Sequence, residues 1–572
     1  MAAYCAEESE SSENSDFESD NSDDLPLSRY CLEIDEDNIP LARHPCRRNS
    51  DNETDMDGIG EIVSDESNDD EAFDSISSSD AESSADSDSD HGQIADPNNF
   101  AWSSNLVSHG DLNFDQATVG PTDPQLLSPI QLFCNFFTDY ILQDIVTQTN
   151  LYADQCREDG NNKVAWDKIT LPELKSWLGL LLAMGIVEKK GRTAEYWTKH
   201  WLLQTPGFAT TMSSRRFLTI LRYIHFVDNR DPTIDKNYKL WKIQPLITYL
   251  TRRFQRVYRP RCQIAIDETM IKFKGRLKIK QYIQNKPTKW GIKLFTLAES
   301  KTGYVLNVIP YAGKRADTDV SKTTQTVMDV LEPYLRRGHH LFMDNYYTSV
   351  ELMKRLEQEG TLSCGTVRSN RKGLPAEKMK KTAPAVKKLK RGESITLMQG
   401  RMAAVTWKDS RVVNLLTNLP GPQVLGDTEV QRREKTKDGV REFAIKKPVA
   451  INTYNTYMGG VDLSDQRVST YRRHMKSLTW YLQIFYHFLR LSVVQAFIIY
   501  KELNPGNKID QKNFTTEVID GLVAGRSFIK KKGRPFSSVA NKENIRFQEN
   551  YSHAPQKLET GGQSCVKCIQ TE

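Results

Sequence analysis

Between residues 262 and 367, the hydrophobic pattern of the chain alternates between the period of a strand and the period of a helix. This alternation constrains the fold more than any other feature, because few sheet topologies fit a given order of elements. The segment is predicted to be α/β, in the order β-β-β-α-β-α-β. The expected elements are strands at Cys262–Asp267, Gly291–Ala298 and Tyr304–Tyr311, a helix at 321–335, a strand at His339–Met343, a helix that starts at Thr348-Ser-Val-Glu351 and stops at Gly360, and a strand at Thr361–Val367.

This order is that of an RNase H-like sheet, in which the first and fourth strands lie side by side. Asp267 ends the first strand, and Asp344 directly follows the fourth. A third acidic residue in such sheets usually comes from a helix after the last strand, and Asp462 has that place. The sequence therefore predicts that the three aspartates form one site, although they are far apart in the chain.

Three carboxylates suit Mg²⁺ or Mn²⁺, which bind hard oxygen ligands and can drive in-line displacement at a phosphodiester. A single Asp after a strand is most often a turn or cap residue, so the prediction depends on all three together. Asp465 lies one helical turn after Asp462 and is either a fourth ligand or a neighbour. Glu268 is excluded, because successive residues of a strand point to opposite faces. No His or Cys pattern with zinc spacing competes within this core.

The regions on either side have a different pattern. Helical spacing dominates residues 129–262, where Thr170-Leu-Pro-Glu173 has the form of a capping box and Ser213 precedes another helix. Residues 372–448 are Lys-rich with short strand-like pieces, which predicts an inserted β-rich subdomain. Helix resumes near Tyr454.

Charge is divided unevenly along the 572 residues. Residues 1–97 hold 30 of the 74 acidic residues but only four of the 77 basic ones. The Ser- and acid-rich arm is predicted to be disordered, and its Ser-Asp runs are candidate kinase targets or a solvating tail. The strongly basic remainder predicts a partner that is a polyanion such as nucleic acid.

Two further features bear on the compartment. The nine cysteines are scattered, and residues 1–20 are not an apolar signal segment, which favours a reducing, intracellular setting without disulfides. Trp480–Tyr500 is apolar enough to be compared with a membrane span, but Arg490, His487 and two glutamines favour a buried core helix. No membrane association is therefore expected.

Several motifs resemble those of the piggyBac family of cut-and-paste DNA transposases, over about residues 129 to 505. They are Ile-Asp-Glu at 266–268, Phe-Lys-Gly-Arg at 273–276, Trp-Gly-Ile-Lys at 290–293, Met-Asp-Asn-Tyr-Tyr at 343–347, Cys-Gly-Thr-Val-Arg-Ser-Asn-Arg-Lys-Gly-Leu-Pro at 364–375, and Tyr-Met-Gly-Gly-Val-Asp-Leu-Ser-Asp-Gln at 457–466.

The resemblance implies a DNA transposase whose catalytic acids are Asp267, Asp344 and Asp462, with Asp465 matching a further acid of the motif. Such enzymes nick double-stranded DNA at transposon ends, form a hairpin and join the element into TTAA sites as dimers. Trp480 matches an aromatic residue near the active site, where it would stack on a displaced base, or it is a core tryptophan. The alternative is a domesticated, non-catalytic DNA-binding or chromatin protein.

The implied organisation is an RNase H-like core within a helical domain. The expected divisions are a disordered acidic arm and linker at 1–128, a helical dimerisation and DNA-binding domain at 129–262 and 472–529, an RNase H-like catalytic domain at 263–371 and 449–471, an insertion at 372–448, and a basic tail at 530–572.

Basic clusters accompany the acidic residues. Arg368, Arg371 and Lys372 follow the last strand, where they are expected to hold DNA phosphates. Arg472 and Arg473 follow the third acid and are expected to do the same. The run Lys530, Lys531, Lys532 and Arg534 resembles either an AT-hook core or a nuclear localisation signal, and the second interpretation predicts a nuclear protein.

The C-terminal cysteines depart from the family pattern. The family usually ends in a Cys/His-rich zinc module, whereas this tail has Cys565-Val-Lys-Cys568 with only His553 nearby. A structural zinc site needs four ligands, so zinc is not expected here. How DNA ends would be recognised is therefore left open.

Overall fold

The computed structural model describes residues 101–529, with gaps at 126, 161–164, 285, 314–320, 422–425, 437–438, 473–476 and 478, together with two short strands, β14 (Pro555–Lys557) and β15 (Gln563–Cys565). The acidic arm, Arg473, the basic run at 530–534, His553 and Cys568 lie outside the described residues, whereas Cys565 ends β15. The chain divides into two compact units between Ser527 and Phe528, and every other described element belongs to the first unit.

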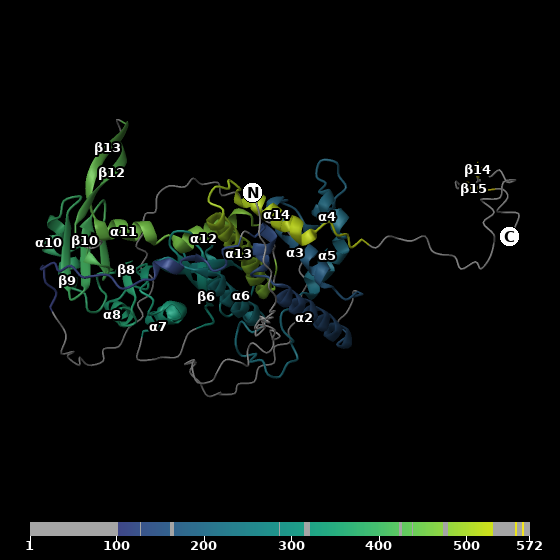
Figure 1. The fold of residues 1–572 in the computed structure, drawn as a ribbon, viewed down its shortest axis with the longest axis horizontal. Helices are drawn as coiled ribbons and strands as arrows, with labels where there is room; N and C mark the ends of the chain where they lie inside the picture. Colours follow the sequence, from purple (N-terminus) through teal and green to yellow (C-terminus); the bar gives the residue numbers. More distant parts are fainter. Residues whose placement is uncertain are drawn as a thin grey trace, which may run out of the picture. The chain divides into compact units, whose positions relative to one another are not determined.

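A large mixed sheet forms the centre of the first unit, and four of its strands, β6, β8, β9 and β10, are labelled in Figure 1. The strands follow the order β6-β5-β3-β7-β8, in which β3 pairs with β7 in parallel and β7 with β8 in parallel, while β5 is antiparallel to both β3 and β6. These strands are β3 (Gln263–Lys272), β5 (Trp290–Glu299), β6 (Val305–Pro310), β7 (His340–Met343) and β8 (Leu362–Thr366), with a two-residue strand β4 (Gln281–Tyr282) on β5. The first and fourth main strands are therefore neighbours, as the sequence predicts.

Two helices connect the later strands. They are α7 (Lys322–Leu331), continued by the 3₁₀ turn η3 (Glu332–Tyr334), and α8 (Val350–Gln358). Ser349 caps α8 by accepting a hydrogen bond from the Leu352 amide, and Gly360 follows in a left-handed conformation that ends the helix.

Three strands of the insertion extend the central sheet. Strand β11 pairs with β8, and β10 and β9 continue outward from β11. The insertion's elements are α9 (Ala376–Met379), α10 (Pro384–Lys388), β9 (Ser394–Gln399), β10 (Met402–Lys408), β11 (Val412–Thr417), and a hairpin of β12 (Asp427–Thr436) and β13 (Gly439–Pro448). The segment is β-rich, as the sequence predicts, and the backbone groups of β11 continue the ladder of β8.

Helices that precede the sheet strands in the sequence pack against helices that follow them. Helix α14 lies on α3, and α13 contacts α1, α6 and α12. The helices are α1 (Pro129–Cys134), α2 (Asp139–Glu158), α3 (Leu171–Ile186), α4 (Pro206–Thr211), α5 (Ser214–Tyr223), α6 (Gln244–Val257), α11 (Val449–Tyr457), α12 (Gly460–Thr470), α13 (Trp480–Leu503) and α14 (Gln511–Val523), with a 3₁₀ helix η2 at Thr193–Trp197.

Helix α13 is the one described helix that is long and apolar enough to cross a membrane, and most of its apolar stretch is buried inside the protein. It supplies core residues such as Phe485 and Phe488, and Phe485 stacks on Trp177 of α3. This burial fits the prediction of a core helix, since a buried apolar helix needs no lipid around it.

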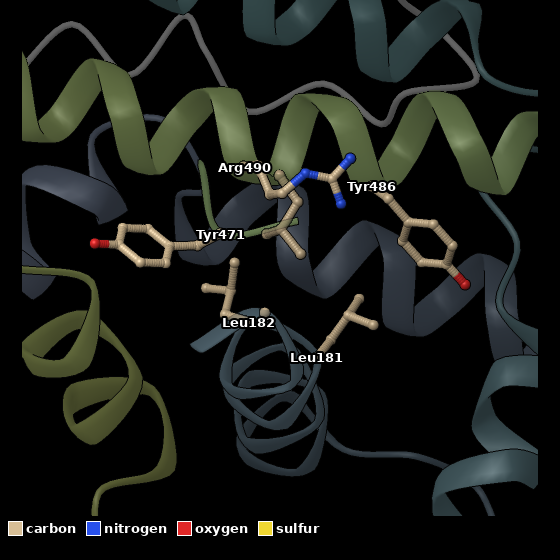
Figure 2. Close-up of a pocket in the computed structure, with 7 residues that line it drawn as sticks. Leu181, Leu182, Tyr471, Tyr486 and Arg490 are labelled. Atoms are coloured by element: carbon tan, nitrogen blue, oxygen red, sulfur yellow. The ribbon is translucent and has the colours of Figure 1, made fainter. Parts of the chain in front are cut away.

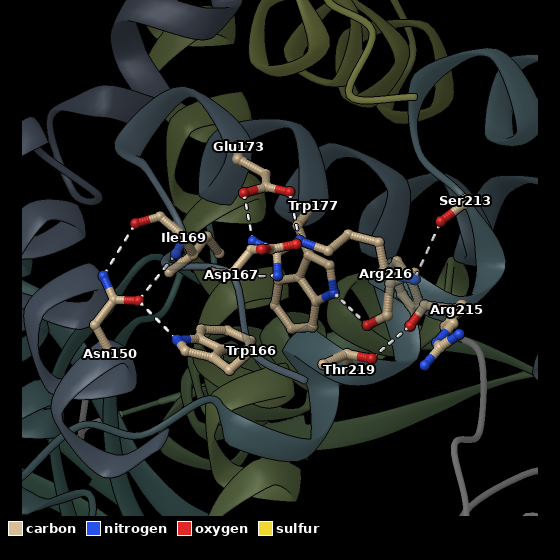
Figure 3. A network of polar contacts seen from close by, with 11 residues as sticks. Asn150, Trp166, Asp167, Ile169, Glu173, Trp177, Ser213, Arg215, Arg216 and Thr219 are labelled. Carbon is tan, nitrogen blue, oxygen red and sulfur yellow. Dashed lines mark hydrogen bonds and ion pairs between the residues drawn. The ribbon is translucent and has the colours of Figure 1, made fainter. Parts of the chain in front are cut away.

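The predicted capping box at Thr170 does not form. The Thr170 side chain makes no capping hydrogen bond, and the Glu173 carboxylate instead accepts two hydrogen bonds of 2.7 Å from the Arg216 guanidinium of α5 (Figure 3). A bidentate, charge-assisted pair in a nearly buried place is stronger than a bond to a backbone amide. Ser213, in contrast, caps α5 as predicted.

The segment predicted as a linker lies along the sheet. Ser103 exchanges two backbone hydrogen bonds with Met398 of β9, and Asp111 bonds the buried His340 of β7 at 2.9 Å. After the short turn η1 (Gln116–Thr118), β1 (Gly120–Pro121) pairs with β2 (Tyr258–Arg259) at the start of the helical part. We call residues 101–121 the strap.

Candidate active site

Two aspartates lie at the same end of neighbouring parallel strands. Ile266 of β3 is in register with Met343 of β7, so Asp267 and Asp344 come next on the two strands. Both strands are buried along this stretch, because their apolar side chains line the core on both faces. Parallel strands bring these two positions to one edge, as the sequence predicts.

Asp267 is buried and neutralised by a lysine. Its Oδ2 accepts a hydrogen bond of 2.8 Å from Lys286 Nζ, and its Oδ1 accepts one of 2.7 Å from the Glu268 amide. Burial raises the pKa of Asp267 to about 8, although the Lys286 ammonium opposes this rise. The ionised form of this buried carboxylate is therefore stabilised only by a cation close to it.

Asp344 occupies the turn that follows β7. Its Oδ1 accepts a hydrogen bond of 2.9 Å from the Tyr346 amide, and Thr348 donates to its backbone carbonyl. Burial raises the pKa of Asp344 to about 6, and the Glu268 carboxylate adds to the rise. The backbone amides of the turn act in the opposite direction and fix the orientation of the carboxylate.

Helix α12 presents two acids to the strand. Asp462, in its first turn, has 71% of its side chain exposed and lies 4.0 Å from Lys286 Nζ. Asp465, one turn later, accepts a hydrogen bond of 3.0 Å from Thr269 Oγ1 of β3, and burial raises its pKa to about 7. The sequence left Asp465 open as ligand or neighbour, and the structure places it against the strand that carries Asp267.

Lys286 stands among these acids, and sequence reasoning missed it. The loop between β4 and β5 carries it, and its ammonium contacts Asp267 and lies at the limit of ion-pair distance from Asp462. Its positive charge also opposes the rise that burial causes in the pKa of Asp344 and of Asp465. No sequence signal could have found it, because it is one lysine in a loop that also holds Lys289.

The donor set fits a hard divalent cation in chemistry, although the side chains are not arranged as a closed site. Among the described residues there is no group of three His, Cys, Asp or Glu side chains spaced to hold a metal ion. The acids nevertheless gather around one positive charge, and burial raises the pKa of three of them. Oxygen donors that are desolvated and close together are what Mg²⁺ and Mn²⁺ bind.

Glu268 has partners of its own. Lys293 Nζ and the Tyr347 hydroxyl donate to Glu268 Oε1 at 3.0 Å and 2.8 Å, and these contacts involve neither Lys286 nor α12. The Glu268 carboxyl nevertheless interacts with that of Asp267 and raises the pKa of Asp344, so its exclusion from the site on the alternation of strand side chains is wrong.

Basic and aromatic side chains border the acids. Arg371 donates to the backbone carbonyls of Asn345 and Tyr346, next to Asp344, and Arg368 approaches the Asn345 side chain at 3.4 Å. Arg368 and Lys372 are exposed. The predicted phosphate-binding cluster after β8 therefore lies beside Asp344.

The second basic cluster and the predicted aromatic residue lie near α12. Arg472 is close enough to Asp465 for each to influence the other's pKa, and burial lowers the pKa of Arg472. Trp480 is half-buried at the start of α13, with its ring 5.7 Å from that of Tyr481.

Comparisons with known proteins identify the family of the chain. A sequence model of the family described as Transposase IS4 matches residues 128–497. Human PiggyBac transposable element-derived protein 3 is 28% identical over 378 residues, which cover 64% of this chain and 60% of that protein. Human PiggyBac transposable element-derived protein 5 is 26% identical over 418 residues, covering 70% of this chain and 76% of that protein.

The chain spans about 60% of the length of the first of these relatives, and 34% of the length of the human Chimeric ERCC6-PGBD3 protein, which it also matches. Among solved structures, the cryo-EM structure of piggyBac transposase synaptic complex with hairpin DNA is similar, with a TM-score of 0.59 and 25% sequence identity. That match covers 71% of this chain and 82% of the other.

Proposed function

Because the chain belongs to the piggyBac family of transposases and transposable element-derived proteins, we propose that it cleaves and joins DNA phosphodiesters with a divalent metal ion. The observation that carries the proposal is the convergence of Asp267, Asp344 and Asp462 from β3, β7 and α12 around Lys286. Acids from separate parts of a chain gather beside one cation when the site serves a cation or a phosphate.

The sheet supports an RNase H-like catalytic core. The order β6-β5-β3-β7-β8, with one antiparallel pair on each side of β5 and parallel pairs on each side of β7, is the topology expected for that fold. Asp267, Asp344 and Asp462 would hold Mg²⁺ or Mn²⁺, with Asp465 next to them. When bound, the metal would activate the attacking oxygen and stabilise the leaving one.

Other residues of the chain would bind and position the DNA. Arg368, Arg371 and Lys372 would hold the DNA backbone beside Asp344, because guanidinium and ammonium groups neutralise phosphates. Trp480 would stack on a base displaced from the duplex. We extend the proposal to action as a nuclear homodimer on double-stranded transposon ends and TTAA targets, as the family resemblance implies.

The substitution Asp344→Asn tests the cleavage chemistry. It preserves the shape of the side chain and the hydrogen bond from the Tyr346 amide, but removes a negative charge from the metal site. We expect DNA binding to be retained and Mg²⁺-dependent nicking of a duplex to be lost. Asp235→Asn, the same change in an exposed loop, is the control. Full cleavage by the Asp344 variant would exclude the proposed metal site.

A second candidate function is a DNA-binding or chromatin protein that keeps the fold without catalysis. Two observations favour it: several relatives are named as transposable element-derived proteins, and no three-ligand metal group is present among the described residues. A wild-type protein that binds duplex DNA but does not nick it with either Mg²⁺ or Mn²⁺, and does not excise an element flanked by its own terminal repeats, would favour this candidate.

A further inference from the structure

Helix α13 buries an arginine in an otherwise apolar stretch. Arg490 is the one Asp, Glu, Lys or Arg between Trp480 and Tyr500. Its Nε is inaccessible to solvent and has no hydrogen-bond partner in the part of the chain that the structure describes. Such an atom is costly to bury, because it loses its bonds to water without gaining others.

The arginine lies beside a small cavity. Figure 2 shows Arg490 and Tyr486 of α13 next to Leu181 and Leu182 of α3, with Tyr471 from the end of α12 nearby. The cavity has a volume of about 20 Å³. A second hollow of similar volume shares Leu182, Tyr471 and Arg490, and Arg467 lines it as well.

Positive charge around this cavity is not balanced by carboxylates of the same segment. Burial, together with the nearby Arg472, lowers the pKa of Arg490 to about 9. Burial also lowers the pKa of Arg467 and of Arg472. Between Asp465 and Glu502 the sequence has no acidic residue at all.

No carboxylate of this segment supplies the counter-charge, which leaves room for an anion from elsewhere. A guanidinium group prefers oxyanions, which it binds with paired, charge-assisted hydrogen bonds. A cavity of this size has room for about one water-sized atom, so it can take a single oxygen of a phosphate but neither a whole phosphate group nor a nucleobase. Arg472 links the cavity to the acidic site, since it interacts with Asp465.

We propose that the cavity beside Arg490 binds a backbone phosphate of DNA, on the side of the acidic residues where α12 meets α13. The subsite rests on the proposed function for its ligand, and it names a contact that the acidic residues and the cluster at Arg368 do not provide. Because the subsite contacts the DNA backbone, it contributes equally to the affinity for every DNA sequence.

The test compares Arg490→Met with wild type in the full-length chain. Methionine keeps the length and apolar stem of the side chain, and Arg336→Met, an exposed arginine before β7, is the control for loss of one charge. Fluorescence anisotropy with two duplexes of unrelated sequence, in EDTA over 50–200 mM salt, gives affinity and its salt dependence. We expect the Arg490 variant to lose about one unit from the slope of log affinity against log salt, equally for both duplexes.

A second measurement separates free anions from DNA. Inorganic phosphate is expected to raise the melting temperature of wild type and of the Arg336 variant more than that of Arg490→Met. Arg490→Lys, which keeps the charge, is expected to retain part of both responses. An Arg490→Met protein with the wild-type salt slope and the wild-type phosphate response would overturn the proposal.

Two other outcomes are also decisive. A phosphate response that depends on Arg490, with an unchanged DNA slope, would overturn the assignment to DNA and leave a free-anion site. Because both measurements exclude divalent metal, a protein that shows the expected slope change but never cleaves DNA would refute the proposed catalysis and support the subsite.

Discussion

At the scale of single residues, burial is the main cause of the raised pKa values of three acidic side chains in the candidate site. The pKa is raised from 3.8 to about 8 at Asp267, about 7 at Asp465 and about 6 at Asp344, in each case chiefly by desolvation. These folded-state values lie above the unfolded ones, so the folded protein binds more protons. The resulting contribution to stability is present below about pH 4 and is lost as pH rises through 6 to 8.

Metal binding should show the opposite dependence on pH. A cation must displace protons from these carboxyl groups, so we expect the affinity for Mn²⁺ to rise from pH 6 and to level off above about pH 8. Isothermal titration calorimetry on the DNA-free protein measures it, with Asp344→Asn as the variant that removes one of the titrating groups. A constant affinity over this range would contradict the involvement of the buried acids.

Lys286 should compete with the metal ion for the same oxygen atoms. Its ammonium lies 2.8 Å from Asp267 Oδ2, where a bound cation would be repelled. We expect Lys286→Met to bind Mn²⁺ about tenfold more tightly than wild type when both are measured at pH 9, where Asp267 is ionised. Lys289→Met, an exposed change in the same loop, should have little effect. Weaker binding by the Lys286 variant would mean that this lysine arranges the acids instead.

At the scale of elements, the position of α12 depends on a close contact between backbones. A Cβ atom on Gly460 would lie 2.9 Å from the Glu299 carbonyl oxygen and 3.0 Å from Ser300 Cα, at the end of β5. Glu299 is held there, because its carbonyl also accepts a hydrogen bond from the Gly303 amide. Only glycine lets the first turn of α12 approach the sheet closely enough to bring Asp462 and Asp465 toward β3.

Gly460→Ala should therefore disturb both stability and the acidic site. We expect a loss of about 1–3 kcal/mol in the free energy of unfolding, measured in urea, because the backbone has to shift. Nicking should fall together with it. Gly459→Ala is the matched control, since nothing lies within 4 Å of a Cβ at that position, and it should cost less than about 1 kcal/mol. Equal losses for the two variants would show that the close approach is unimportant.

The order of the elements could be predicted from the sequence because the spacing of apolar residues differs locally between strands and helices. Strands β3, β5, β6, β7 and β8 each carry an apolar run between turn residues, which places Asp267 and Asp344 on neighbouring strands. The pairing of β11 with β8 joins segments separated by the first part of the insertion, and a ladder between backbones leaves no pattern in side chains. Lys286 was missed for a similar reason, since its partners are distant in the chain.

At the scale of the whole first unit, the strap ties parts of the fold that are far apart in sequence. Trp102 donates to the Gly373 carbonyl, Ser103 adds to the edge strand β9, and Arg401 donates to the Gly110 carbonyl. Asp111 then bonds His340 within the central strand β7. Such contacts, each contributing about 0.5–1.5 kcal/mol, hold the extended sheet together.

Removal of the strap should therefore destabilise the sheet even though the strap itself contains little regular structure. We compare a chain that begins at residue 101 with one that begins at residue 123. Both lack the acidic arm, so the difference isolates the strap.

His340 would lose the partner of its buried imidazole, and the edge of β9 would be left open. We expect the shorter chain to melt roughly 5–10 °C lower by differential scanning calorimetry. Asp111→Asn in the longer chain should give a small part of this effect, because asparagine can still bond His340. Equal melting temperatures for the two chains would show that the strap only lies on the sheet, and that the ladder from β5 to β9 is stable without it.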